Sequence, residues 1–356
     1  MKLSEKSCKR IVVKIGSSLF YDSKKKLSFG LLESICADIA SLRKENKEVV
    51  IVTSGAIALG MSVLKLTDRP KDLSTLQASA AIGQNELMDI YRNTFRRKGL
   101  KCGQVLLTWD DFSNRVRYLN ARNTLSRLLA LGVVPVINEN DTVSIDEIKF
   151  GDNDQLSALV ANTVDADLLI VLSDVDGLWG KDKKTIIRQV SDINADITGL
   201  AATTKRCTSV GGMITKLKAA GITIDAGIPC VIANGRAKSI ISGLASDPYS
   251  NGTIFLPKGS GLNHRQRWLA HSTKPSGSIV VDDGAKNALK NKKSLLSVGI
   301  VSCKGSFKAG DIISICDKES IEIGRGQTNM NSQDIIEVKG KRSPREVIHC
   351  DNIVIF

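Results

Sequence analysis

Short aliphatic runs alternate with longer segments of helical periodicity from about residue 10 to residue 255. This alternation is typical of parallel strands joined by crossover helices. Predicted strands lie at 11–15, 49–53, 103–107, 133–138, 168–173 and 229–233. Predicted helices lie at 29–45, 74–98, 120–131, 153–163 and 213–226. Because the strand runs are continuously apolar, we expect an open, mainly parallel sheet sandwiched by helices, an α/β fold.

The pattern changes after Phe255. Residues 259–275 are rich in Gly, Ser, Pro and basic residues, which predicts a linker with one short ordered turn near Trp268. Beyond it, short strand-like runs recur between turn signals, with one helical stretch at DDGAKNALK, and predict a small, mainly β module at 276–356. A chain of 356 residues exceeds the usual size of a single core, so 1–258 should form a separate, larger domain.

Composition excludes several classes of protein. Hydrophobic residues make up 42% of the chain and charged residues 24%, which argues against long disordered stretches. The 8 cysteines never form a CxxC pair and the 3 histidines lack metal-like spacing, so no zinc site is predicted. Cys230 and Cys316 lie in apolar runs that suit buried thiols in a reducing cytosol. With no signal-like start and no membrane-length apolar run, we expect a cytoplasmic protein that does not contact a membrane.

The net charge of +13 is compatible with a nucleic-acid partner, because basic side chains bind phosphates. Its distribution weakens that interpretation. Residues 276–356 carry 12 Lys and Arg against 10 Asp and Glu, so +2 of the net charge lies there and +11 lies in residues 1–275. Anionic substrates of the larger domain explain part of that excess.

Two glycine-containing segments beside lysines are candidate phosphate sites. KIGSS follows a predicted strand, where Gly16 would let backbone N–H groups approach phosphate oxygens and Lys14 adds a positive charge. VGGMITK, residues 210–216, precedes a helix that would direct Lys216 back toward a bound phosphate. An ordinary strand-to-turn junction and a flexible hinge with a solvated lysine remain the alternatives. Neither segment is a P-loop, since GxxxxGK[ST] is absent.

Two more strand ends carry small and polar residues. TSGAIALG opens a helix that Thr53 or Ser54 would cap, leaving N–H groups open to a substrate carboxylate. The alternative is that its small residues only permit close packing against the sheet. Ser173 and Asp174 leave a buried strand at the position where open α/β sheets bind nucleotides. A turn built from the Asp-Gly pair that follows is the alternative there.

An unusual density of acids and amides lies between the two lysine segments. VINENDTV contains Asp141, and GDND about ten residues later contains Asp152, Asn153 and Asp154. Carboxylates bind an ammonium group and amides bind a carboxylate, so this cluster suits both ends of an amino acid. Capping of the next helix by an aspartate would explain one of these residues. With two lysines flanking it, the cluster predicts phosphoryl transfer, which needs positioning and positive charge.

Six segments together resemble a known family. They are KIGSS, IVTSGAIALG, NARNTL, VPVINENDTV, FGDNDQLSALVA and GGMITK. In this order and spacing they resemble the bacterial glutamate 5-kinases of the amino-acid kinase superfamily, and the C-terminal module resembles a PUA domain. The resemblance spans essentially the whole chain. It implies the amino-acid kinase fold and ATP-dependent phosphorylation of the L-glutamate γ-carboxylate to γ-glutamyl 5-phosphate, the first step of proline biosynthesis.

The resemblance also implies roles for individual residues. Catalysis is implied for Lys14, Lys216 and Asp154, with Asp154 orienting the two lysines. Glutamate binding is implied for Ser54, Asp141, Asn153 and Asp152. Nucleotide binding is implied for Lys14, Gly16, Ser173, Asp174, Val210, Gly211, Gly212, Met213, Ile214, Thr215 and Lys216. Val210 departs from the family, which usually has threonine there, so a hydroxyl contact to the nucleotide is lost or comes from Ser209.

By the same resemblance, the γ-carboxylate attacks the γ-phosphorus of ATP in line, with Mg²⁺ bridging phosphates and no metal ligand assigned to the protein. A carboxylate is already ionised and needs no general base, which agrees with the first histidine being His264. A homo-oligomer, dimer or tetramer, and feedback inhibition by proline are also implied. The alternatives are another amino-acid kinase, acting on aspartate, acetylglutamate, carbamate or a nucleotide, and RNA binding by the C-terminal module. RNA binding is not favoured, because Phe307 is the one aromatic of that module before the final residue.

Overall fold

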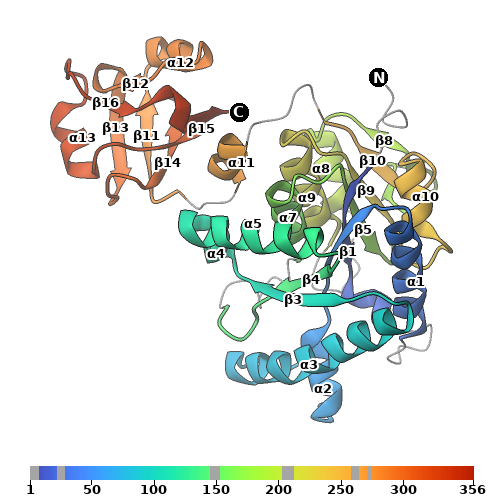
Figure 1. Ribbon diagram of the computed structural model, residues 1–356. Coiled ribbons are helices and arrows are strands. Elements are labelled where there is room, and N and C mark those ends of the chain that lie inside the picture. The colour runs from blue at the N-terminus through green and yellow to red at the C-terminus, as the bar shows by residue number, and fades with distance from the viewer. Residues whose placement is uncertain (1–7, 22–28, 145–152, 203–211, 258–263, 272–274) are drawn as a thin grey trace. The chain divides into compact units, whose positions relative to one another are not determined.

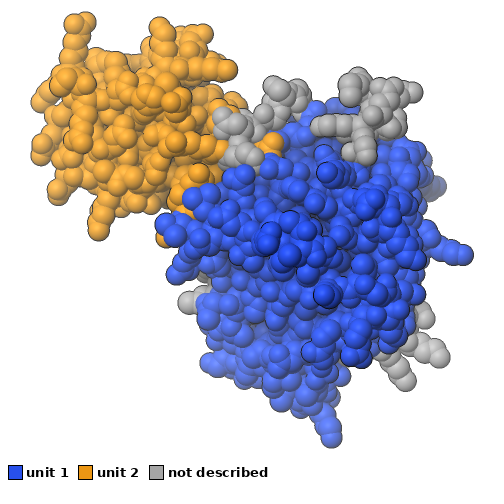
Figure 2. Space-filling model, in the orientation of Figure 1, with its two compact units in different colours: residues 1–111, 116–261 blue, residues 112–115, 262–356 orange. Residues whose placement is uncertain are grey.

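The structure, a computed structural model, describes residues 8–21, 29–144, 153–202, 212–257, 264–271 and 275–356. The chain divides into two compact units (Figure 2). The first comprises Met1–Asp111 and Val116–Gly261, and the second comprises Phe112–Arg115 and Leu262–Phe356. The finer division into 1–258, 259–275 and 276–356 stays a prediction.

A sheet of eight strands, counted over the described residues, forms the centre of the first unit (Figure 1). Its order is β3 (Cys102–Leu107), β4 (Val134–Glu139), β2 (Glu48–Val52), β1 (Arg10–Ile15), β5 (Leu168–Ser173), β9 (Cys230–Asn234), β10 (Thr253–Phe255) and β8 (Gln189–Val190). Every pair from β3 to β9 is parallel, whereas β10 is antiparallel to β9. The predicted mainly parallel sheet is confirmed, and each predicted strand ends within one residue of its observed ends.

Helices cover both faces of this sheet. On one face α7 and α9 contact each other, and on the other α1 contacts α10 (Figure 1). The helices of this part of the chain are α1 (Gly30–Lys44), α2 (Ala56–Val63), α3 (Leu73–Arg97), α4 (Trp109–Ser113), α5 (Arg115–Ala130), α7 (Asn153–Thr163), α8 (Ala195–Ala202), α9 (Met213–Asp225) and α10 (Ile240–Ser246). A 3₁₀ turn η2 (Ser17–Phe20) and a small hairpin of β6 (Leu178–Trp179) and β7 (Ile186–Ile187) complete it. Helix α5 begins earlier than predicted, because Tyr118 extends its buried face.

Helices α2 and α3 approach each other backbone to backbone. A Cβ atom on Gly83 would lie 1.8 Å from the carbonyl oxygen of Ala56, and one on Gly60 would lie 1.8 Å from that of Ser79. No side chain fits in either place, so the small residues of TSGAIALG serve helix-to-helix packing rather than the expected packing against the sheet. This contact holds the segment that leaves β2 against the middle of α3.

The second unit is a small, mainly β module, as predicted. Its larger sheet has the order β13 (Ile300–Gly305), β11 (Gly277–Val281), β14 (Ile312–Cys316), β15 (Glu322–Gln327) and β17 (Ile353–Ile355). The remaining elements are α11 (His264–His271), α12 (Asp283–Lys290), β12 (Leu295–Leu296), η3 (Ser297–Gly299), α13 (Ser332–Val338), β16 (Glu346–Ile348) and η4 (Cys350–Asn352). A separate core that includes Ile279, Ile313 and Val347 fills it. Helix α13 and strand β16 were not predicted.

Helix α11 shows more order than the single short turn expected near Trp268. Trp268, Leu269 and Ala270 are buried, and the indole N–H of Trp268 donates a hydrogen bond to the carbonyl oxygen of Phe112 at 2.8 Å. Burial of this apolar side of the helix explains why a sequence rich in turn-forming residues is helical here. Across the residues that the structure describes, no helix has both the length and the apolar character needed to span a membrane.

The two cysteines predicted to be buried differ. Cys230 is fully buried in β9, and desolvation raises the pKa of its thiol. Cys316, by contrast, is only half-buried at the end of β14, so the expectation of burial was wrong for it. The alternating exposure of β14 places this side chain near the face that is not packed on the core.

Candidate active site

The carboxyl ends of four neighbouring strands bring polar residues to one edge of the first unit's sheet. Lys14 lies near the end of β1, Ser54 follows β2, Asn138 lies near the end of β4 and Ser173 ends β5. The strand order β4-β2-β1-β5 makes these ends adjacent, although more than a hundred residues of sequence separate some of them. This edge is the usual ligand-binding side of an open parallel sheet.

Asp154 lies at the centre of a buried ion-pair cluster. Its Oδ1 is 2.5 Å from Nζ of Lys14, and its Oδ2 is 3.2 Å from Nζ of Lys216. The hydroxyl of Thr215 donates to Oδ2 at 2.7 Å and also lies 2.9 Å from the carbonyl oxygen of Gly212. Asp154 is 1% exposed and each lysine 6%. Three charged groups from β1, α7 and α9 therefore share one site that is largely closed to water.

The two lysines keep Asp154 ionised. Burial alone would raise the pKa of its carboxyl, but Lys14 and Lys216, with a further hydrogen bond from Thr215, hold that pKa well below the usual range. Two buried ammonium groups therefore share one carboxylate. Positive charge held at fixed positions stabilises the oxygens of a phosphoryl group during transfer, so the cluster is suited to such a group.

Lys216 reaches this cluster from the first turn of α9. The helix begins after Gly212, which has an extended backbone. No atom lies within 4 Å of the position that a Cβ atom on Gly212 would take. A side chain in the first turn of a helix points toward the N-terminus, which directs Lys216 to Asp154. Met213 of the same segment is buried and Ile214 is 41% exposed, so their side chains lie on different faces of the helix. Val210 and Gly211 lie outside the described residues.

Asn153 precedes Asp154 but has different partners. Its Nδ2 donates to the carbonyl oxygen of Thr53 at 2.8 Å, to Oγ of Ser54 at 2.8 Å and to Oδ1 of Asn138 at 3.0 Å. Its Oδ1 is buried and accepts no hydrogen bond from any residue that the structure describes. A buried acceptor without a donor is costly, so this atom marks a position for a ligand donor.

Asn138, which the sequence interpretation did not assign, connects Asn153 to helix α3. It is 1% exposed, its Nδ2 donates to Oε1 of Gln84 at 2.8 Å, and its Oδ1 also accepts from the backbone N–H of Glu139 at 3.0 Å. Asn138 was visible as the first asparagine of VINEND. Gln84 had no local signal, because it is one of many polar residues within a long amphipathic helix.

The residues predicted to hold glutamate are only partly placed. Ser54 and Asn153 are in direct contact, as described above. Asp141 is half-buried and follows β4, while Asp152 lies outside the described residues. Capping of α2 by Thr53 or Ser54 was wrong: its N-cap is Gly55, with a φ of 100° and no side-chain hydrogen bond, a backbone that glycine adopts readily.

Gly16, on the predicted nucleotide side, uses its own backbone N–H within the sheet. This N–H donates to the carbonyl oxygen of Leu172 at 3.1 Å, so it is not open to a phosphate. A Cβ atom on Gly16 would lie 3.2 Å from the Leu172 carbonyl oxygen and 3.7 Å from Nζ of Lys14, so a side chain here would be tight against β5 and would lie beside that lysine. Ser173 is buried and its Oγ lies 3.3 Å from Oδ1 of Asp174, which is exposed at the sheet edge.

Arg236, also not predicted, ties two loops of this edge together. Its guanidinium donates to the carbonyl oxygens of Ser18 at 3.2 Å and Tyr21 at 2.7 Å. The neighbouring Asn234, at the end of β9, donates to Oδ1 of Asp176 at 2.8 Å. The turn after β1 and the loop after β5 are thus both held by residues that follow β9.

The described residues of the first unit do not form a resident metal site. Both oxygens of Asp154 face lysines, which leaves no free carboxylate at the centre of the cluster. Within the described ranges, the histidine, cysteine and carboxylate side chains close enough to share an ion are His349, Cys350 and Asp351 of the second unit.

Comparison with known proteins identifies the family. The model of the amino acid kinase family matches residues 9–234, which include β1, α7, α9 and the buried cluster. The chain belongs to the amino acid kinase family. The model of the PUA domain matches residues 277–350 of this amino acid kinase, within the second unit.

Relatives of this kinase are similar along its full length. Glutamate 5-kinase of Caldanaerobacter subterraneus subsp. tengcongensis is 44% identical and that of Pelobacter propionicus 43% identical, each over 98% of both chains. Glutamate 5-kinase of Geobacter sp. is 42% identical over 99% of this chain and 98% of its own.

Two solved structures share the fold at low sequence identity. Giardia carbamate kinase has a TM-score of 0.50 at 14% identity and covers 71% of this kinase and 100% of its own chain. N-acetylglutamate synthase from Neisseria gonorrhoeae has a TM-score of 0.53 at 14% identity and covers 72% of this kinase and 62% of its own chain. These similarities concern the fold alone.

Proposed function

We propose that this protein transfers the γ-phosphoryl group of ATP to the γ-carboxylate of L-glutamate, giving γ-glutamyl 5-phosphate and ADP. The observation that carries the proposal is the buried cluster of Lys14, Asp154 and Lys216. One residue away lies Oδ1 of Asn153, a buried acceptor that has no donor within the described part of the chain. Full-length relatives that are named glutamate 5-kinase support glutamate as the acceptor substrate.

Residues on the β2 and β4 side of the cluster bind glutamate. The free Oδ1 of Asn153 accepts a hydrogen bond from the α-ammonium group of the substrate. Ser54, which is already bonded to Asn153, with Asp141 and Asp152, completes the set of residues that hold the amino acid. The substrate is thereby oriented with its γ-carboxylate toward the lysines, which is the main requirement for in-line transfer.

The lysines stabilise the charge that moves during transfer. Lys14 and Lys216 bring positive charge close to the oxygens of the transferred group. Asp154 keeps the two ammonium groups at fixed positions on either side of its carboxylate. The attacking γ-carboxylate is ionised at neutral pH, so no side chain has to remove a proton. Catalysis here rests on positioning and electrostatics.

The nucleotide binds along the β5 and β9 side. Ser173, Asp174 and the segment from Val210 to Lys216 contact it, and the absence of a side chain on Gly16 leaves room beside Lys14. Mg²⁺ would enter with the nucleotide, because this ion usually binds through substrate phosphates and one or two carboxylates rather than in an all-protein cage. When bound, it neutralises charge on the nucleotide phosphates.

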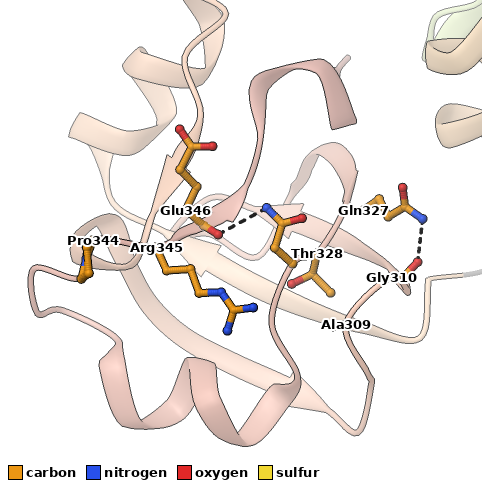
Figure 3. A pocket seen from close by; sticks show the side chains of 8 residues that line it. Ala309, Gly310, Gln327, Thr328, Pro344, Arg345 and Glu346 are labelled. Carbon is orange, nitrogen blue, oxygen red and sulfur yellow. Dashed lines mark hydrogen bonds between the residues drawn. The ribbon is translucent and has the colours of Figure 1, made fainter.

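RNA binding is the competing function, and the second unit has one feature relevant to it. A surface pocket of about 680 Å³ opens there between the turn at Gly310, the end of β15 and the start of β16 (Figure 3). It is lined by Ala309, Gly310, Gln327, Thr328, Asn329, Pro344, Arg345 and Glu346. Sequence-specific RNA recognition usually stacks bases on aromatic side chains, and this lining contains none. The pocket therefore gives no support to RNA binding.

Three further features are proposed from the family resemblance. They are a cytoplasmic location, a homo-oligomer that is a dimer or tetramer, and feedback inhibition by proline, the end product of the pathway that γ-glutamyl 5-phosphate enters. Sedimentation of the purified protein, and its activity at increasing proline concentrations, test the second and third.

Detection of an acyl phosphate tests the reaction directly. Purified protein with ATP, Mg²⁺ and hydroxylamine should form a hydroxamate with glutamate, and much less with aspartate, N-acetylglutamate or carbamate as the acid. Release of ADP should depend on glutamate to the same extent. Equal or greater product with another acid would identify a different amino acid kinase activity.

A further inference from the structure

Three side-chain amides form a chain of hydrogen bonds from helix α3 to the substrate side of the cluster. Gln84 accepts from Asn138, and Asn138 accepts from Asn153, at 2.8 and 3.0 Å. Gln84 and Asn138 are both buried, at 9% and 1% exposure. The chain ends at the Oδ1 of Asn153, which has no donor among the described residues.

The orientation of each amide in this row of hydrogen bonds is determined by backbone groups that can only donate or only accept. The backbone N–H of Glu139 can only donate, so the atom of Asn138 that faces it is its oxygen. The amide nitrogen of Asn138 must then face Gln84, and the side-chain oxygen of Gln84 accepts the hydrogen bond. At the other end, the carbonyl oxygen of Thr53 can only accept, so Asn153 presents nitrogen there and oxygen on its free side.

From this arrangement we propose that Gln84 is a positioning residue for the acceptor substrate. It acts through Asn138 to hold Asn153 with its oxygen directed at the α-ammonium group of glutamate. The proposal rests on the proposed function, because it assumes that the ligand at Asn153 is an amino acid. Gln84 itself does not contact the reacting atoms.

Loss of the Gln84 oxygen would leave the Asn138 nitrogen buried without an acceptor. A buried donor without an acceptor is costly, so the Asn138 side chain would rotate toward another acceptor. Rotation of Asn138 would remove its oxygen from both Glu139 and Asn153, and Asn153 would then lose one of its three acceptors. The loss of these hydrogen bonds should therefore weaken substrate binding. It should leave the lysines in place, because Asp154 holds them through a separate set of contacts.

Gln84 also sits where the scaffold is rigid. Its neighbour Gly83 packs against the backbone of α2 with no room for a side chain. A movement of α3 toward α2 at this contact would produce a clash, so the helix holds the oxygen of Gln84 within hydrogen-bond distance of Asn138. A positioning group needs such support, because a displacement of about 1 Å is enough to lose a productive geometry.

Steady-state kinetics of three variants test the proposal. Gln84→Met keeps the volume but removes the acceptor, and should raise the KM for glutamate about tenfold, the loss of one good hydrogen bond, with the KM for ATP within about twofold of wild type. Gln84→Glu keeps an acceptor for Asn138 and should restore the glutamate KM to within about threefold. Thr94→Val, an equally buried polar residue of α3 outside the chain of amides, is the matched control and should change neither constant.

The outcomes separate the possibilities. A selective rise in glutamate KM in Gln84→Met, reversed in Gln84→Glu, supports the proposal. An unchanged glutamate KM, an equal rise for ATP, or a Glu variant as impaired as the Met variant would overturn it. If Gln84→Met does not fold, as judged by thermal melting, Gln84→Ala takes its place with the same expected result. A wild-type enzyme that forms no acyl phosphate with glutamate would instead refute the proposed function.

Discussion

Asn153 and Asp154, the first two residues of α7, direct their side chains to different groups of partners. Asn153 contacts Thr53, Ser54 and Asn138, whereas the carboxylate of Asp154 contacts Lys14, Lys216 and Thr215. Consecutive helical residues point about 100° apart, so one turn of helix serves two sites at once. Binding of the acceptor and stabilisation of the transferred group thus depend on adjacent residues but on separate contacts.

Removal of the Lys216 ammonium group should affect turnover more than binding. We expect Lys216→Ala to lower kcat by about 100- to 1,000-fold, the loss of about 2.7 to 4 kcal/mol that one charge-stabilising donor supplies, with a small change in glutamate KM. Lys218→Ala, on the exposed side of the same helix, is the control and should be near wild type. A wild-type kcat for Lys216→Ala would remove this lysine from the transfer step.

Neutralisation of Asp141 should weaken glutamate binding. Asp141→Asn keeps the shape of the side chain but removes a negative charge that attracts the substrate ammonium group, so we expect a raised glutamate KM with a smaller change in kcat. The KM for ATP, measured in the same preparation, should stay constant. If the glutamate KM is unaltered, Asp141 lies outside the substrate site.

Loss of the Asp154 charge should destabilise the fold. Asp154→Asn removes the negative charge that two buried ammonium groups share, and removal of one partner of a buried pair costs about 3 to 5 kcal/mol. The free energy of unfolding at neutral pH, from urea titration, should fall by that amount. A loss below about 1 kcal/mol would mean that the lysines find other partners.

The destabilisation of Asp154→Asn should depend on pH in one direction. The pKa of Asp154 is lower in the folded state than the ordinary value of about 3.9, so its ionised form stabilises the protein above that value and less as pH falls below it. The difference in unfolding free energy between wild type and variant should be constant from about pH 8 to pH 5 and narrow below about pH 4. A difference that widens on acidification would contradict the sign of the pKa shift.

The addition of even one methyl group at the contact between α2 and α3 should destabilise the fold. A Cβ atom in Gly83→Ala would lie 1.8 Å from the Ala56 carbonyl oxygen, so we expect a loss of about 1 to 3 kcal/mol or more from forced separation of the helices. Gly243→Ala lies in helix α10 with nothing within 4 Å of the new atom, and should be stabilising by about 0.5 to 1 kcal/mol. Thermal melting should therefore move in opposite directions for these two changes.

Much of the architecture was predictable because it depends on local patterns. Continuous aliphatic runs identified the six central strands to within one residue, and apolar periodicity identified the principal helices. The same reasoning drew attention to Lys14, Asp154 and Lys216, since each stands at a strand end or a helix start. The second core was predictable from the change in pattern after Phe255.

Other features arise only when distant segments meet. The N–H of Gly16 is occupied by Leu172 because β5 pairs beside β1, and nothing in KIGSS reveals that neighbour. Gln84 gains a partner because α3 passes within hydrogen-bond distance of Asn138, near the end of β4. Arg236 meets the turn after β1 from more than two hundred residues away.

Local sequence patterns set the positions of the strands and helices and the residue types available at their ends. The meeting of one carboxylate with two lysines, and the row of amides that directs one oxygen to the substrate side, arise from the folded arrangement of distant segments. The reason is physical: secondary structure follows from contacts between near neighbours in the chain, whereas the direction of a buried hydrogen bond depends on the strand order and on which groups can only donate or only accept.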